Sequence, residues 1–451
     1  MRPEDLRKGV NKIRDYAERN GAEAAIFRAL EGAGEFLSDR NYDRERKDDI
    51  PFPVLEKVSD GPFISVVIPV FDPDPDDFAH LLDSLISQSY VNFEAVITDG
   101  GSNEDILRVV EAYRDDPENK LNIVYKRLEE NKGISGNTNE ALTLASGEYI
   151  SFLDHDDFLE PDALLLTVDK IRDGALMVYT DEDKYDSLTG TYLTPNRKCG
   201  FNLDLLLSNN YICHLLTVKA DLVKKAGGLR SGFDGAQDYD LILRLTELIP
   251  AEKIAHVDKI LYHWRITPSS TSGNPDSKLY AYENGKKALE DYFEKRGINA
   301  SVTHTLHRGF YRADYSEAEV DSGEYLIFID NRIVPLDPDY EKKLAGFFAR
   351  KEVGIVGARI IGKTGGTVYN GYSISENGEK VPEYGKMDYR FSGYMHKASL
   401  IRETGAVSLH AFAIRSSLKD LISRDAVSMC EGARKRGFKV IVDPGIMFKL
   451  R

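Results

Sequence analysis

The sequence lacks several features that mark common protein classes. Its 451 residues include three cysteines, Cys199, Cys213 and Cys430, with no CxxC spacing between them. A disulfide scaffold and a zinc site built from several thiolates are therefore not expected, and the set fits a reducing cytoplasm. No apolar run approaches the ~18–20 residues that span a bilayer, and the charged N-terminus is unlike a signal peptide. These absences predict a cytoplasmic protein.

An excess of positive charge is also missing. Lys and Arg number 59 against 74 Asp and Glu, which gives a net charge of −15. Since nucleic-acid binding needs a basic surface that displaces phosphate counterions, no nucleic-acid partner is expected, although a local basic pocket for a small anion remains open. The chain has no GxGxxG after its first predicted strand and no GxxxxGK[ST]. These absences disfavour a dehydrogenase and a P-loop ATPase, and the acidic loop DPDPDD disfavours a sugar-nucleotide pyrophosphorylase.

What the sequence does contain is enough apolar residues for two or three domains. Residues 1–60 have helical spacing, with Leu6, Val10, Ile13 and Tyr16 at steps of three or four, and Gly21 separates two helices. The segment SDRNYDRERKDDIPFP, residues 38–53, is predicted to be a charged linker that ends in prolines. This region is interpreted as a solvated helical hairpin packed on the main body. The alternative is a helix that contacts a partner or a membrane, but its charges are mixed rather than basic.

After residue 60, apolar runs alternate with amphipathic segments. Four strands are predicted at 63–71, 92–102, 121–128 and 148–154, and helices lie between them. Short turns between strand and helix are typical of a doubly wound α/β sheet. In such sheets ligands bind at the carboxyl ends of the strands, where the polar turn residues of this sequence also lie.

The densest chemical signal is the segment FLDHDDFLEP, in which Asp154, Asp156 and Asp157 follow the fourth strand. Carboxylates this close repel one another unless a cation neutralises them, and Mg²⁺ or Mn²⁺ prefers oxygen ligands of this kind. The alternative is an acidic helix cap. The position at the carboxyl end of a strand favours a metal site.

Three further segments carry polar groups with two interpretations each. Asp238 and Asp240 stand at the entry of a helix, where they serve either as a base or as partners of the helix dipole. In YHWR, His263 and Arg265 alternate along a strand and share one face, which suits a diphosphate or an exposed edge strand. In TDEDKYD, Asp181 and Asp183 bind sugar or acceptor hydroxyls, or form a charged turn.

Together these motifs resemble the inverting family 2 glycosyltransferases of the GT-A fold. The order FISVVIPVF, AVITDGGS, NKGISGNTNEAL, YISFLDHDDFLEP, AQDYDLILRL and YHWR covers residues 63–302. The segments TDEDKYD and LLLSNNYICHL are similar to the branch that builds bacterial surface polysaccharides, such as rhamnosyltransferases. The resemblance implies a mixed, mostly parallel, Rossmann-like sheet.

The resemblance also implies roles for individual residues. The nucleotide would contact Pro69, Val70, Phe71, Asp99, Asn131, Gly133 and Asp154. The metal, Mg²⁺ or Mn²⁺, would bind Asp154 and Asp156, and the diphosphate His263 and Arg265. Asp238 would be the general base, with Gln237, Asp181 and Asp183 near the sugar or acceptor. Three positions depart from the family pattern: Gly100 replaces a second acid, Thr138 replaces an arginine, and Gln237 replaces a glutamate.

These roles define an inverting transfer of a sugar from a nucleotide diphosphate to a hydroxyl of a glycan or lipid-linked acceptor. The metal offsets charge on the leaving group, and one carboxylate takes the acceptor proton in a single displacement. By the same resemblance, the chain would contact the inner face of the cell membrane peripherally. The alternative function is a catalytically silent scaffold that binds sugars or nucleotides.

An internal repeat defines the rest of the chain. Residues 145–161 and 321–337 align without a gap and share SGEY, and Asp154 corresponds to Asp330, but Asp156 becomes Arg332. The second copy therefore lacks the metal-binding acids and the first three strands, and no second active site is expected. The sequence predicts a helical region and linker at 1–60, a GT-A domain at 61–302, a connector at 303–321 and a truncated GT-A-like domain at 322–451. An incomplete sheet exposes an edge that favours a partner such as a second copy of the chain.

Overall fold

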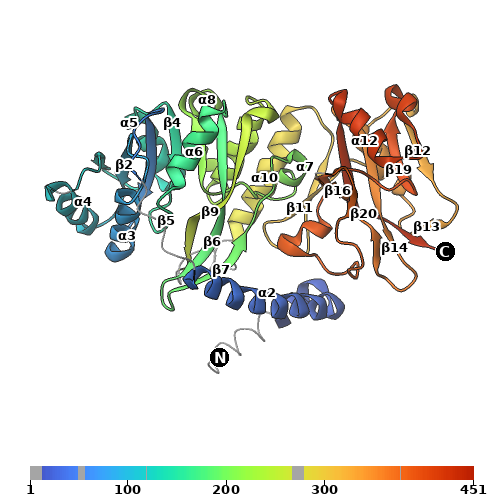
Figure 1. Ribbon diagram of the computed structural model, residues 1–451, viewed down its shortest axis with the longest axis horizontal. Coiled ribbons are helices and arrows are strands. Elements are labelled where there is room, and N and C mark those ends of the chain that lie inside the picture. Colours follow the sequence, from blue (N-terminus) through green and yellow to red (C-terminus); the bar gives the residue numbers. More distant parts are fainter. Residues whose placement is uncertain (1–12, 49–55, 118, 267–278, 376) are drawn as a thin grey trace. The chain divides into compact units, whose positions relative to one another are not determined.

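A computed structural model describes residues 13–48, 56–117, 119–266, 279–375 and 377–451 (Figure 1). Residues 13–20 are helical, Gly21 interrupts the helix, and α2 (Ala22–Asp48) follows, as the helical spacing predicted. The prediction of a linker was wrong for residues 38–48, which continue α2 because this charged segment has no helix-breaking residue before Pro51. The predicted positions Leu6 and Val10 and the linker residues 49–53 lie outside the described residues. In the part of the chain that the structure describes, no helix combines the length and apolar character needed to cross a bilayer.

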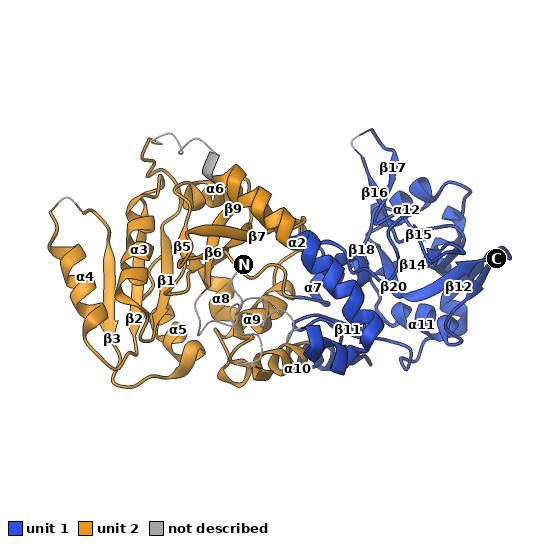
Figure 2. Cartoon of the chain, turned by 90° about the horizontal axis from the view of Figure 1, so that it is seen from below, with its two compact units in different colours: residues 1–35, 202–209, 290–451 blue, residues 36–201, 210–289 orange. Residues whose placement is uncertain are grey.

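The described chain forms two compact units (Figure 2). Unit 1 comprises residues 1–35, 202–209 and 290–451, and unit 2 comprises 36–201 and 210–289. The helices after α2 are α3 (Pro75–Ile86), α4 (Asp105–Asp115), α5 (Gly133–Leu144), α6 (Ala163–Arg172), α7 (Leu203–Leu206), α8 (Ala220–Ala226), α9 (Gln237–Thr246), α10 (Leu279–Lys295), α11 (Tyr340–Gly346) and α12 (Ala426–Lys435). The domain limits given by the sequence remain predictions.

Unit 2 contains a nine-stranded sheet with the order β3-β2-β1-β4-β8-β6-β9-β5, and β7 pairs with β6. Its strands are β1 (Ile64–Val70), β2 (Phe93–Asp99), β3 (Ile123–Arg127), β4 (Tyr149–Phe152), β5 (Phe158–Leu159), β6 (Met177–Asp186), β7 (Thr191–Asn196), β8 (Leu216–Lys219) and β9 (Ile254–Ile266). β1 is parallel to β2 and β4, and β6 is parallel to β9. The predicted mixed, mostly parallel α/β sheet is confirmed.

The first β–α connection shows how the sequence specifies this sheet. Every residue of β1 is buried, as expected for an inner strand covered on both faces. The acidic loop then begins α3: the Asp74 carboxylate accepts hydrogen bonds from the backbone N–H groups of Asp76 and Asp77, and Pro75 occupies the first turn. Leu81 and Leu85 of α3 are buried in the same apolar core as β1. The local signals and the tertiary packing therefore agree.

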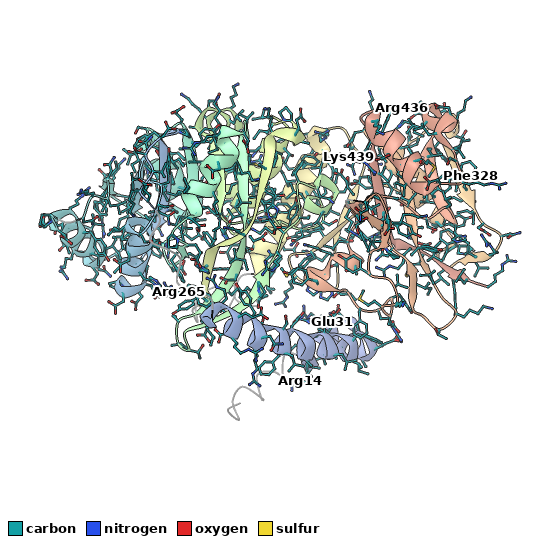
Figure 3. The ribbon with its side chains drawn as sticks, viewed as in Figure 1. Arg14, Glu31, Arg265, Phe328, Arg436 and Lys439 are labelled. Atoms are coloured by element: carbon teal, nitrogen blue, oxygen red, sulfur yellow. The ribbon has the colours of Figure 1, made fainter. Side chains whose placement is uncertain are left out.

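Unit 1 contains a seven-stranded sheet with the order β12-β19-β14-β20-β13; β15 pairs with β14 and β18 with β20. Its strands are β12 (Tyr325–Ile329), β13 (Ile333–Pro335), β14 (Val353–Ile361), β15 (Thr367–Tyr369), β18 (Arg402–Glu403), β19 (Ala411–Arg415) and β20 (Lys439–Leu450). Two small ribbons pair β10 (Ser301–His304) with β11 (Tyr311–Asp314), and β16 (Tyr372–Ile374) with β17 (Lys380–Pro382). Phe328 of β12 stacks on Phe412 of β19 in the core (Figure 3).

The second sheet repeats part of the first, as the internal alignment predicted. The order β12-β19-β14-β20-β13 corresponds strand for strand to β4-β8-β6-β9-β5. The directions match as well, because β6 and β9 are parallel, as are β14 and β20, while the other pairs along both series are antiparallel. Counterparts of β1, β2 and β3 are absent among the described residues of unit 1, and β12 is the edge of its sheet. The predicted truncated second domain is confirmed.

A buried ion pair inside unit 1 ties α7 to this second sheet. The Arg350 guanidinium and the Asp204 carboxylate are 2.5 Å apart at their closest atoms, and each side chain is about 1% exposed. The Tyr315 ring lies under the guanidinium, with 5.7 Å between the ring centre and the central guanidinium carbon. The short α7 segment therefore belongs to unit 1 although it lies between strands of unit 2 in the sequence.

Candidate active site

The residues predicted to bind a nucleotide lie at the carboxyl ends of β1 and β2. Pro69 and Val70 end β1, and Phe71 follows with 48% of its side chain exposed. Asp99, the last residue of β2, is fully buried. Its carboxylate accepts hydrogen bonds from Tyr125 Oη at 2.7 Å and Arg127 Nη1 at 2.6 Å. Burial and this hydrogen bond raise the pKa of Tyr125 to about 12. Asp99 therefore already has two side-chain donors.

The other two predicted nucleotide contacts form the entry to α5. Asn131 Oδ1 accepts hydrogen bonds from the Gly133 backbone N–H and from Asn137 Nδ2, both at 3.0 Å. Gly133 has φ +75°, and a Cβ there would lie 2.9 Å from the Asp234 carboxylate. Since L-residues rarely adopt this backbone conformation, the position favours glycine. The first turn of α5 is thus fixed next to the loop that precedes α9.

The three carboxylates of the acidic turn after β4 have different surroundings. Asp157 is fully buried and accepts hydrogen bonds from the Arg265 backbone N–H at 2.8 Å and from Tyr262 Oη. It therefore fastens the turn to β9. Asp154 is 48% exposed and lies 3.7 Å from His214 Nε2. None of the residues in the described ranges makes a hydrogen bond or ion pair with the Asp156 carboxylate.

The carboxylates of this turn also interact with each other through their charge. Close packing around the turn raises the pKa of Asp154, His214 opposes the shift, and the negative charges of Asp156 and Asp238 add to it. A bound cation stabilises carboxylates whose negative charges repel one another. Carboxylate oxygens are also the ligands that Mg²⁺ and Mn²⁺ prefer. The residues present therefore fit the divalent ion that the sequence predicts.

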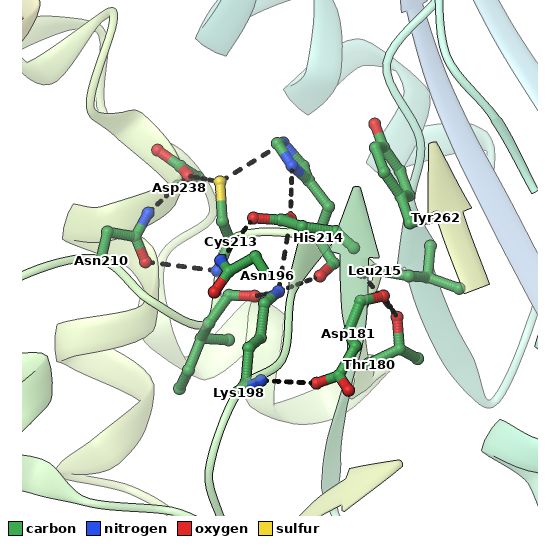
Figure 4. Close-up of polar contacts among 12 residues, drawn as sticks. Thr180, Asp181, Asn196, Lys198, Asn210, Cys213, His214, Leu215, Asp238 and Tyr262 are labelled. Carbon is green, nitrogen blue, oxygen red and sulfur yellow. Dashed lines mark hydrogen bonds and ion pairs between the residues drawn. The ribbon is translucent and has the colours of Figure 1, made fainter. Parts of the chain in front are cut away.

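The predicted base, Asp238, is the second residue of α9. Asn210 Nδ2 donates a hydrogen bond to its Oδ2 at 2.7 Å, and the Cys213 thiol is 3.5 Å from the same oxygen (Figure 4). Two residues on, Asp240 forms buried ion pairs with Arg230 and Arg244. Asp240 is thus paired with arginines, whereas Asp238 is contacted by the uncharged donors Asn210 and Cys213.

The remaining predicted contacts bond to other groups of the protein. Gln237 Oε1 accepts a hydrogen bond from the Gly235 N–H. Asp181 is fully buried and interacts with His256 Nε2 at 2.7 Å. Arg265 is 2% exposed; its Nε donates to the Asp156 carbonyl at 2.6 Å, and its Nη1 pairs with Asp77. Arg265 therefore supports the backbone of the acidic turn.

His263 belongs to a buried network of four charged side chains and a tyrosine. Its Nδ1 lies 2.5 Å from Asp183 Oδ1 and its Nε2 2.9 Å from Glu160 Oε1. Burial opposes the charged imidazole, but the two carboxylates outweigh burial and raise the pKa of His263. The network is completed by residues from the part of α2 in unit 2: Arg46 pairs with Glu160, and Tyr42 Oη donates to Asp183 at 2.6 Å. His263 and Asp183, two predicted substrate contacts, are thus held by the protein itself.

Residues that the sequence analysis did not single out surround Asp238. Asn210, Cys213 and His214 come from the loop before β8, and Lys198 Nζ donates hydrogen bonds to the carbonyls of Ile212 and His214 in that loop (Figure 4). The available signal was a run of polar side chains inside the apolar segment LLLSNNYICHLL. That signal does not say which element the loop would face.

Comparison with known proteins relates this arrangement to a family. Residues 65–219 match the sequence model described as glycosyl transferase family 2. Residues 65–219 are thus similar to the family 2 glycosyltransferases. The match covers β1 to β8, which includes the acidic turn and the Cys213–His214 loop but ends before Asp238. The resemblance in the sequence is thus confirmed at the level of the family.

Among curated relatives, the uncharacterized protein y4gI of Sinorhizobium fredii is 41% identical over 54% of this chain and 26% of its own length. The O-antigen biosynthesis protein RfbC of Myxococcus xanthus is 31% identical over 55% of the chain and 19% of its length. Chondroitin synthase of Escherichia coli is 31% identical over 57% of this chain and 36% of its own length. The chain therefore spans between about a fifth and about a third of the length of these relatives.

Among solved structures, the chain is similar to that of Staphylococcus aureus TarS residues 1–349 in complex with UDP-GlcNAc. It is 19% identical, with a TM-score of 0.42, over 51% of this chain and 66% of that chain.

Proposed function

We propose that the chain transfers a sugar, with inversion, from a nucleoside diphosphate to a hydroxyl of a glycan or lipid-linked acceptor in surface polysaccharide synthesis. The observation that carries the proposal is that one loop contacts both acidic groups: His214 Nε2 lies 3.7 Å from Asp154 of the β4 turn, and the neighbouring Cys213 Sγ lies 3.5 Å from Asp238 Oδ2. A carboxylate base and a set of oxygen ligands for a metal are the two groups this reaction needs. The names of the relatives, among them an O-antigen biosynthesis protein and a chondroitin synthase, support the substrate class.

Asp238 would act as the general base. Its Oδ2 has the amide of Asn210 as a neutral donor, so the second oxygen can accept the acceptor's proton. A carboxylate is a weak base, but it suffices when the proton leaves late, after bond formation has made the hydroxyl acidic. A single displacement inverts the anomeric carbon.

Asp154 and Asp156 would hold Mg²⁺ or Mn²⁺. When bound, the ion stabilises negative charge on the departing nucleotide. Asp157 and Arg265 would keep the turn in place, because they fix its backbone and leave the Asp156 carboxylate available. Pro69, Val70, Phe71, Asp99, Asn131 and Gly133 would surround the nucleotide. An acceptor attached to a lipid would bring the chain to the inner face of the cell membrane.

The degenerate copy supports a single active site. At the position equivalent to the acidic turn, Asp330 pairs with Arg332 and with His410 Nδ1 at 2.9 Å. Arg332 holds the pKa of Asp330 below its usual range. Since Arg332 supplies the charge that a metal would supply in the first copy, the second site does not need a cation.

The decisive experiment is a donor screen. The protein with Mg²⁺ or Mn²⁺ is given a panel of sugar nucleotides, and nucleotide release is measured with and without glycan acceptors. We expect Asp238→Asn to lower the transfer rate by ~10²–10⁴-fold, whereas Asp221→Asn, on the surface of α8, is the control and should leave it unchanged. Near-normal transfer by Asp238→Asn would remove Asp238 as the base. Binding of a sugar nucleotide without turnover would favour the silent scaffold instead.

A further inference from the structure

A second group of potential metal ligands lies beside Asp238. Cys213 Sγ is 3.4 Å from His214 Nε2, and His214 Nδ1 is 3.2 Å from Glu182 Oε2 (Figure 4). One ligand atom from each of these three residues lies within 4.8 Å of the other two. These two distances involve opposite nitrogens of the His214 ring, of which one ion binds only one. With one nitrogen chosen, the three ligand atoms lie within 4.8 Å of one another, so small side-chain adjustments bring them to the ~3.3–3.8 Å that metal–ligand bonds of ~2.0–2.3 Å require.

The three side chains are held in place by the surrounding structure. The His214 ring stacks on the Tyr262 ring, with 4.6 Å between the ring centres and 10° between the planes. Lys198 fixes the loop through the Ile212 carbonyl at 2.6 Å, and Glu182 lies on β6 and is buried. Ligands that are already ordered lose little conformational entropy when an ion binds.

The ligand types differ from those of the acidic turn. A thiolate, an imidazole and a carboxylate match Zn²⁺ and similar transition metals, whereas Mg²⁺ and Mn²⁺ prefer oxygen. Lys198 Nζ also approaches Glu182 Oε2, at 3.3 Å. An ion would share that carboxylate with the lysine, so binding is expected to be weaker than at a site built from several thiolates. The cysteine spacing in the sequence disfavoured a site of that kind, but not one with a single cysteine.

We propose that Glu182, Cys213 and His214 form a transition-metal site for Zn²⁺. Its ligands differ from the Mg²⁺ or Mn²⁺ ligands Asp154 and Asp156, although His214 Nε2 lies 3.7 Å from Asp154. On binding, the Cys213 thiol releases its proton to solvent and a sulfur–metal bond forms. The thiol then no longer donates to Asp238, whose oxygen lies 3.5 Å away. The cation bound to Cys213 also lies near the Asp238 carboxylate and favours its ionised form, which makes Asp238 a poorer base, so Zn²⁺ inhibits transfer. This consequence depends on the proposed function of Asp238, but the binding itself does not.

Cobalt provides a test of binding that does not need activity. The full chain is titrated with Co²⁺, which takes zinc sites and gives a strong thiolate-to-cobalt absorption band. We expect the band in the wild type, its disappearance on adding Zn²⁺, and its loss in Cys213→Ser. Cys199→Ser is the matched control and should keep it. Thermal unfolding of both variants establishes that they are folded. Absence of the band in the wild type, or its persistence in folded Cys213→Ser, would overturn the proposal.

Inhibition is measured separately, with Mg²⁺ or Mn²⁺ in excess and Zn²⁺ varied. Loss of one ligand should raise the Zn²⁺ concentration for half-inhibition by at least about tenfold in Cys213→Ser. Equal inhibition of both proteins would overturn the inhibitory part of the proposal. A cobalt band that depends on Cys213, in a protein that turns over no sugar nucleotide, would support the metal site and refute the proposed function.

Discussion

The network around His263 predicts a large effect of a single substitution in α2, Arg46→Met. The network contains two carboxylates, Asp183 and Glu160, and two cations, Arg46 and His263. Replacing Arg46 by methionine keeps an unbranched apolar chain of similar length but removes one positive charge. Two buried carboxylates then share a single imidazolium, and one negative charge is left without compensation.

The magnitude follows from burial. The Arg46 and Glu160 side chains are 16% and 9% exposed, so the pair is close to the buried limit, where loss of one partner costs ~3–5 kcal/mol. His263 remains 2.9 Å from Glu160 and compensates part of the loss. We therefore expect the free energy of unfolding of unit 2 to fall by roughly 2–3 kcal/mol. For a unit of this size, that lowers Tm by roughly 5–10 °C.

The single tryptophan of the chain makes this effect measurable. Trp264 lies on β9 of unit 2, next to His263, so its fluorescence reports the unfolding of that unit alone. The control is Arg108→Met, because the Arg108 side chain is 69% exposed in its ion pair with Asp105 and should contribute less than ~1 kcal/mol.

A second variant separates lost charge from lost packing. Glu160→Gln in the Arg46→Met background removes the stranded carboxylate, so the double variant should be more stable than Arg46→Met alone. A fall in Tm for Arg46→Met no larger than that for Arg108→Met would refute the reasoning, because the helix would then not stabilise the network.

Three further predictions follow from other parts of the structure. Arg350→Met leaves its buried carboxylate partner uncompensated and should lower the free energy of unfolding of unit 1 by ~3–5 kcal/mol, measured by calorimetry; a change under ~1 kcal/mol would contradict it. Gly147→Ala places a Cβ 2.4 Å from a backbone nitrogen, so it should lower the free energy of unfolding of unit 2 by ~1–3 kcal/mol, measured by Trp264 fluorescence. Its counterpart in the repeat is Gly323, where the nearest atom to an added Cβ is 3.3 Å away, so Gly323→Ala should be nearly neutral. Burial lowers the pKa of His307 to about 4 and that of His396 to about 2. The unfolded chain binds these protons near pH 6.5, so stability of unit 1 should fall as pH drops from 7 towards 4, and His307→Phe should flatten that profile.

Much of the fold could be predicted because its signals are local. β1 reads ISVVIPV, and every residue of it is buried, since an inner parallel strand needs apolar side chains on both faces. Gly21 separates two helices because it lacks the side chain that stabilises a helix interior. The repeat at 145–161 and 321–337 predicted the second sheet, because equal sequence patterns favour equal strand–turn–strand units.

The candidate site could be predicted only in part. Asp154, Asp156 and Asp238 stand out because acids follow a strand or begin a helix, which is visible in the sequence. The same rule singled out Asp157, which turned out to be a buried acceptor for Tyr262 and the Arg265 backbone. A carboxylate that ligates and one that fastens a turn are identical in sequence, and they differ only in which donors surround them.

The sequence by itself determined the order of strands and helices, the acidic turn after β4, the family and the loss of acids from the second copy. Only the tertiary structure decided which polar groups neutralise one another. His263 lies between Asp183 and Glu160 because β6, β5 and α2 meet there, and Cys213 faces Asp238 because the loop before β8 reaches α9. Hydrogen bonds and ion pairs act over a few ångströms, so their partners depend on how distant segments pack, which local sequence patterns do not specify.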